Sequence, residues 1–140
     1  LFASTTGTDA DWIVKLIDVY PEDSSDLNMA NYQLMIADEV IRSKFKDSFS
    51  EPKPLVPDEI NHFKISLGTR AHKFKKGHRI MVKIHSTWFP LIDRNPQNFI
   101  NIPTATKNDY VVATQSIFLS RSKATYIELP VIQKEENNDE

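Results

Sequence analysis

Alternation of apolar and polar residues with a period of two is the feature that most constrains the fold of this chain. It occurs in residues 63–67, 80–85, 116–120 and 126–129. Such alternation places one face of a β-strand on a core and the other in solvent. Residues 12–20 are instead apolar on both faces apart from Lys15 and Asp18, which predicts a central strand.

Prolines lie between these runs or at their ends. Because proline cannot donate to a strand ladder, it marks strand ends and connections. Six or more short strands, joined by long loops and not alternating with helices, indicate a sandwich rather than a doubly wound sheet. We therefore predict an all-β fold, a β-sandwich that is mostly antiparallel, with long loops and at most one short helix.

The segment 29–41 allows two interpretations. Its apolar residues fit one face of a helix, or a strand over 32–37 followed by a short turn of helix. We favour the strand, because an Asn/Asp/Ser-rich loop at 22–28 precedes it.

The 140 residues suit one domain, which we place at 1–133 and expect to be followed by a disordered acidic tail at 134–140. Residues 1–4 already have strand character and no Met precedes them, so we interpret the N-terminus as a cut inside a strand.

Composition excludes several classes of partner and site. The net charge of −2 gives no electrostatic reason to expect nucleic acid or an anionic membrane. No apolar run reaches the length of about 18 residues that a transmembrane helix needs. The absence of cysteine excludes disulfides and thiolate metal sites.

The chain also lacks a recognisable nucleophile. With glycine only at positions 7, 68 and 77, the motif Gly-x-Ser-x-Gly is absent, so we predict no catalytic residue and no enzyme activity for this chain alone. The histidines have no metal-ligand spacing and are interpreted as strand-end or surface residues, so no metal or cofactor is expected. A metal-dependent enzyme remains the weakest alternative, built from His62, His72, Asp9 and Asp11.

Asp9 and Asp11 are two residues apart just before the predicted central strand at Trp12. We predict that they bond backbone N–H groups at the strand start and that one of them pairs with an arginine, Arg79 or Arg94. Calcium binding is the alternative, although no further ligand ladder follows.

A cluster of large apolar residues, Trp88 and Phe89, precedes a charged turn that contains Asp93 and Arg94. Because tryptophan is mostly buried in proteins, we favour a plug at one end of the sandwich or at a domain interface, with Asp93 and Arg94 locking the loop. The alternative is a carbohydrate-binding module in which Trp88 and Phe89 stack on a sugar ring.

Several motifs in order resemble the C-terminal domain of the X-prolyl dipeptidyl-peptidase and cocaine esterase superfamily. They are Gly-Thr-Asp-Ala-Asp-Trp at 7–12, Lys-Leu-Ile-Asp-Val-Tyr-Pro at 15–21, Pro-Leu-Val-Pro at 54–57 and Lys-Gly-His-Arg-Ile-Met-Val at 76–82. Ser-Thr-Trp-Phe-Pro-Leu at 86–91 and Asp-Arg-Asn-Pro-Gln at 93–97 are most similar to the α-amino acid ester hydrolase and glutaryl cephalosporin acylase branch.

This resemblance implies a galactose-binding-like jelly roll that is the accessory domain of a serine hydrolase cleaving esters or amides. The family's jelly roll begins with strands that would lie before Leu1, so the resemblance also implies that the domain at 1–133 lacks its first strands. The implied partners are the protein's own upstream α/β-hydrolase and cap domains, together with further copies of the parent in a homo-oligomer. The domain would help to shape the substrate entrance. The resemblance favours a periplasmic or secreted location over the cytoplasm, and none of the family's catalytic residues maps onto this chain.

Overall fold

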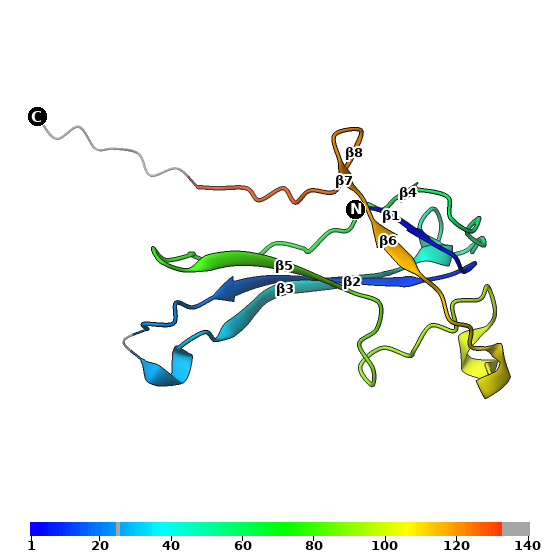
Figure 1. The fold of residues 1–140 in the computed structure, drawn as a ribbon, viewed down its shortest axis with the longest axis horizontal. Coiled ribbons are helices and arrows are strands. Elements are labelled where there is room, and N and C mark those ends of the chain that lie inside the picture. Colours follow the sequence, from blue (N-terminus) through cyan, green and yellow to red (C-terminus); the bar gives the residue numbers. More distant parts are fainter. Residues whose placement is uncertain (25, 133–140) are drawn as a thin grey trace, which may run out of the picture.

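Two three-stranded antiparallel sheets enclose the core of this protein, seen here in a computed structural model that describes residues 1–24 and 26–132 (Figure 1). The first sheet has the order β3 (Gln33–Arg42), β2 (Asp11–Val19), β5 (Arg79–His85). The second has the order β4 (Asn61–His62), β1 (Phe2–Thr5), β6 (Gln115–Ile117), and a separate hairpin joins β7 (Leu119–Ser120) to β8 (Lys123–Ala124).

Strand β2 occupies the centre of the first sheet, as its two apolar faces predict. Every residue of β2 except Lys15 is buried. β3 and β5 pair with it antiparallel on either side, and the pairing with β3 has a register shift between Leu16 and Ile17.

Strand β3 is longer than predicted. It runs through to Arg42, and the helical turn begins only at Ser43. The prediction that the strand ends at residue 37 was therefore wrong, because pairing with β2 continues until Arg42 lies opposite Asp11.

The all-β fold class is confirmed. The helical content within the described residues consists of four three-residue 3₁₀ turns: η1 (Leu27–Met29), η2 (Ser43–Phe45), η3 (Ile102–Thr104) and η4 (Lys107–Asp109). Among the described residues, no helix is both long enough and apolar enough to cross a membrane. The predicted tail at 134–140 lies outside the described residues.

The core lies between the sheets and is centred on two aromatic rings. Trp12 and Phe63 are 2% and 1% exposed, and their ring centroids are 5.7 Å apart. Ala3, Ala10 and Leu55 complete the buried cluster. The Trp12 indole donates a hydrogen bond of 3.0 Å to the Ser43 hydroxyl, so its polar atom is satisfied inside the core.

Two of the segments with period-two alternation do not form the strands that were predicted. Residues 63–67 keep the alternation, with Phe63 buried and Lys64 and Ser66 exposed, yet β4 ends at His62. In the described chain the pairing continues for one more residue, from Phe63 to Leu1. Residues 126–129 likewise contain no strand. The alternation identifies a face for the core, but a strand also needs a neighbouring backbone.

The first sheet is covered unevenly. Ile80 and Val82 lie opposite Asp18 and Leu16 in the ladder and therefore share their face, because directly opposed residues point the same way. The β2 residues on this face are buried, whereas Ile80 and Val82 are 54% and 39% exposed. Part of a core-type apolar face is thus open to solvent along β5.

Candidate functional site: a loop surface anchored by buried ion pairs

The long connection between β5 and β6 is anchored to the first sheet through the Asp11 carboxylate. Asp11 is 1% exposed and receives two hydrogen bonds of 2.9 Å from Arg42, one from Nε and one from Nη2. Asn95 in the connection donates a third bond of 2.8 Å from Nδ2 to Oδ1. Arg42 Nη2 also donates to the Asp93 carbonyl at 3.2 Å, so one ion pair joins β2, β3 and the connection.

The predicted pairing of a carboxylate with an arginine occurs, but both named arginines were wrong. Arg42 is the partner, because it lies directly opposite Asp11 in the β2–β3 register. The hydrogen bonds that Arg42 donates to Asp11, together with the negative charge of Asp11, raise the pKa of Arg42. Arg79 begins β5 opposite Val19, at the far end of the ladder, and Arg94 lies on the exposed loop.

Asp9 satisfies backbone N–H groups at the strand start, as predicted. It is completely buried, and its Oδ1 accepts hydrogen bonds of 3.0 Å from the backbone N–H groups of Ala10 and Lys44. Its Oδ2 has no hydrogen-bond partner and lies 3.8 Å from the Lys44 ammonium. Burial raises the pKa of Asp9 despite these contacts.

The connection approaches the first strands closely at Gly7. A Cβ atom at Gly7 would lie 2.4 Å from the Gln97 carbonyl oxygen, and Thr8 N donates to that same oxygen at 3.0 Å. Only glycine permits this contact, so Gly7 fixes where the loop lies against the sandwich.

Beyond this anchor the connection presents aromatic and cationic side chains outward. Trp88 is half-buried, and the Lys15 ammonium lies 3.4 Å from its ring centroid. Phe89 is 63% exposed, and Leu91 is 69% exposed. Phe89 therefore does not form the predicted plug within the sandwich, and a place for Trp88 and Phe89 at a domain interface stays a prediction.

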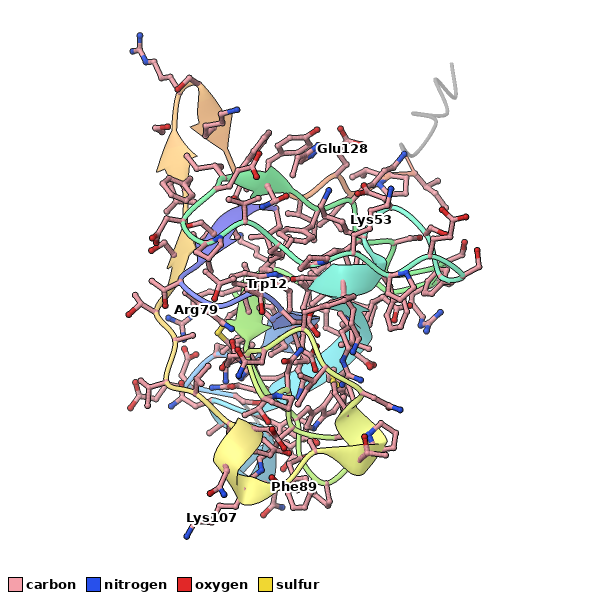
Figure 2. All side chains as sticks on the ribbon, turned by 90° about the vertical axis from the view of Figure 1, so that its right-hand side faces the viewer. Trp12, Lys53, Arg79, Phe89, Lys107 and Glu128 are labelled. Atoms are coloured by element: carbon pink, nitrogen blue, oxygen red, sulfur yellow. The ribbon has the colours of Figure 1, made fainter. Side chains whose placement is uncertain are left out.

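Arg94 lies near two aromatic rings of this loop. Its guanidinium carbon is 5.8 Å from the Phe89 centroid and 5.4 Å from the Tyr110 centroid. Arg94, Lys107 and Tyr110 line an open groove of about 580 Å³ with Ala105 and Thr106. Figure 2 shows Phe89 and Lys107 at the same end of the molecule.

Two histidines converge on a second buried carboxylate, which the sequence analysis missed. Asp18 is 1% exposed, and its two oxygens lie 2.8 Å from His72 Nε2 and from His78 Nδ1. The acid in the middle of an apolar strand was the available signal, because a buried carboxylate requires partners. The three side chains hold the segment that leads into β5 against β2.

The residues suggested for a metal-dependent enzyme do not come together. The His62 ring stacks on Phe2 at 4.5 Å, His72 bonds Asp18, and Asp9 lies beside Lys44. Within residues 1–24 and 26–132, no group of three His, Cys, Asp or Glu side chains could hold a metal ion.

The fold and the site together define a β-sandwich domain whose long loop is fixed to one sheet by a buried ion pair. Residues 1–126 match the family described as the X-Pro dipeptidyl-peptidase C-terminal non-catalytic domain. The chain belongs to this family.

Similar proteins are much longer than this chain. Cocaine esterase from Rhodococcus sp. (strain MB1 Bresler) is 27% identical over 134 residues, which are 96% of this chain and 22% of the esterase. Among solved structures, an α-amino acid ester hydrolase has a TM-score of 0.85 with 45% identity, over 88% of this chain and 20% of that one. An aminopeptidase from the marine sediment archaeon Thaumarchaeota archaeon has a TM-score of 0.79 with 47% identity, over 82% of this chain and 19% of that one.

Proposed function

We propose that this chain is the non-catalytic accessory domain of a larger serine hydrolase that cleaves esters or amides, and that it packs on the α/β-hydrolase core of that protein. The observation that carries the proposal is the open part of the core-type face, where Ile80 and Val82 are exposed beside buried β2. Exposed apolar area of this kind is commonly covered by a partner. The hydrolase class is supported by the names of the similar proteins, an esterase, an ester hydrolase and an aminopeptidase.

The second sheet offers a specific place for additional chain. Leu1 and Phe63 exchange two hydrogen bonds, from Leu1 N to Phe63 O at 2.9 Å and from Phe63 N to Leu1 O at 2.8 Å. This pair continues the β1–β4 ladder by one rung. We propose that residues upstream of Leu1 in the parent extend the ladder along residues 64–67, which keep the burial alternation of a strand.

The loop between β5 and β6 is the proposed contribution of the domain to the substrate entrance and to oligomer contacts. It projects from the side of the first sheet opposite the β1–β4–β6 layer (Figure 1). The ion pair of Asp11 with Arg42 gives it a fixed attachment, so a loop that contacts other domains would keep a defined position.

Carbohydrate binding is the less favoured function. The Lys15 ammonium lies over the Trp88 ring, which leaves less of that ring open for stacking on a sugar. Phe89 alone remains exposed from the proposed platform.

Ester hydrolysis tests the proposal. The parent protein, the parent without residues 1–140, and this chain alone are assayed with a chromogenic ester, each with and without a serine-directed inhibitor. The parent should turn over ester in an inhibitor-sensitive reaction, its truncated form should have a lower kcat/KM, and this chain should show none above buffer. Inhibitor-sensitive turnover by this chain would refute the proposal, and an unchanged kcat/KM after truncation would refute the role at the entrance.

A further inference from the structure

In this domain the guanidinium of Arg94 is already held in position by neighbouring aromatic residues. Its guanidinium lies within about 6 Å of two ring centroids, the range of cation–π attraction, at 5.8 Å from Phe89 and 5.4 Å from Tyr110. The Tyr110 hydroxyl in turn donates to the Arg94 carbonyl at 3.5 Å. A planar guanidinium held in this way loses little freedom when its N–H groups engage a ligand.

The charge of Arg94 is not compensated within the part of the chain that the structure describes. No carboxylate there lies within 4.0 Å of Arg94 or of Lys107, which lines the same groove. Asp109 is close in sequence to Lys107, but its Oδ2 accepts hydrogen bonds of 2.7 Å from the Thr106 backbone and hydroxyl. These bonds lower the pKa of Asp109 and keep the carboxylate engaged inside its own turn.

The contrast with Arg42 shows what is missing at Arg94. Arg42 has a carboxylate bound through two parallel hydrogen bonds. Arg94 lies near aromatic rings and is exposed, but no carboxylate in residues 1–24 and 26–132 pairs with it. The neighbouring Phe89 is 63% exposed. Exposed aromatic area around an arginine is typical of a protein interface, where both residue types are enriched.

We propose that Arg94 binds a carboxylate side chain presented by the hydrolase part of the parent protein, with Lys107 adding positive charge and with Phe89 packed against apolar atoms around that carboxylate. The inference rests on the proposed function and adds to it the contact point and its chemistry. A carboxylate complements both the fork of N–H donors and the positive charge of the groove. Asp or Glu on the facing domain therefore supplies the anion.

Carbodiimide coupling in the full-length parent tests this directly. Arg94→Lys places a primary amine where the guanidinium lay, and the reagent joins an amine to a carboxylate that touches it, with loss of the reagent as its urea. Peptide mapping should find an isopeptide bond from position 94 to an Asp or Glu outside the 140 residues of this chain. Arg121→Lys, which substitutes an exposed arginine in the β7–β8 turn, is the matched control and should not form that bond.

Three results would overturn the inference: no coupling at position 94, coupling only within the 140 residues, or coupling only between two copies of the protein. A second variant, Arg94→Gln in the parent, should speed hydrogen exchange in residues 88–94 by about tenfold, as expected for the loss of one charge-assisted pair. If β5 is protected in the parent while both tests at Arg94 fail, the domain docks through another surface. The proposed function then stands and this inference falls.

Discussion

At Asp11 a buried carboxylate is compensated by an arginine on the neighbouring strand. Removing one partner of such a pair leaves the other charge uncompensated, which costs far more than the net stability of the intact pair. Arg42→Met should therefore lower the free energy of unfolding by about 3 kcal/mol, at the low end of the range for buried pairs because the Arg42 side chain is 22% exposed. Urea denaturation measures the loss.

Lys46→Met is the control for this prediction. It removes an ion pair with Asp47 whose side chains are 27% and 63% exposed, and it should cost less than about 1 kcal/mol. Equal losses for the two variants would contradict the role assigned to Arg42.

The raised pKa of Asp9 predicts the direction in which the free energy of unfolding changes with pH. Burial raises its pKa above the ordinary value of 3.8, so the folded state binds the proton more tightly than the unfolded state. The contribution of Asp9 is then fully present below pH 3.8 and is lost as pH rises through the raised value. Asp9→Asn should remove this decline.

The measurement is the free energy of unfolding of the natural protein minus that of Asp9→Asn across the acidic range. The difference should become less favourable to the natural protein as pH rises. A difference that increases with pH would mean that the Lys44 ammonium, 3.8 Å away, outweighs burial.

At the scale of elements, the segment that leads into β5 is held on the sheet by Asp18. Asp18→Ala removes the acceptor for His72 and His78, and the nearly buried His78 cannot replace it with water. We expect a loss of about 1–3 kcal/mol in the free energy of unfolding, the cost of an unsatisfied buried group. Amide exchange in residues 72–78 should accelerate as well.

Asp23→Ala is the matched control for this element. Asp23 is exposed in the turn after β2, and its loss should change stability by less than about 0.5 kcal/mol. Unchanged exchange in residues 72–78 of the Asp18 variant would show that the histidines do not hold the segment.

The sequence correctly predicted the strands that pair with another strand of this chain. It also predicted strands where this chain provides no neighbouring strand. The alternation at 80–85 became β5, and the apolar run from Trp12 became the central strand β2. The same alternation at 63–67 carries no information about which backbone lies beside it, so it predicted a ladder that is not formed here.

The pairing of Asp11 also depends on which backbone lies beside its strand. The sequence indicated that Asp11 needs an arginine, but ending the third strand at residue 37 removed Arg42 from the register in which it faces Asp11. The distances between Arg94 and its two aromatic rings depend on the path of a long irregular loop, which no periodicity encodes.

At the scale of the whole molecule, the exposed apolar side chains predict that the chain in isolation is marginally stable and self-associates. Ile80 on the open sheet face, Leu119 in the hairpin and Val131 near the end of the described chain are 54%, 77% and 81% exposed. Each Å² of apolar surface that stays exposed lacks the stabilisation of about 25 cal/mol that its burial would provide. Sedimentation velocity should show species that grow with concentration, and thermal unfolding should occur below about 65 °C.

A monomer at all concentrations with a two-state transition above that temperature would contradict this prediction. It would indicate that residues 1–140 form a self-sufficient domain.

Docking of this domain on a hydrolase core is the central claim, and hydrogen exchange compared between the isolated chain and the full-length parent tests it most directly. Regions that contact only this domain should have the same amide exchange rates in both samples. Regions that pack on the hydrolase core should exchange more slowly in the parent. We predict slower exchange in the parent for β5, for residues 64–67 and for residues 88–94, with the exposed β7–β8 turn unchanged. Equal rates in all three segments would contradict the account, because the domain would then be attached to its parent without packing on it.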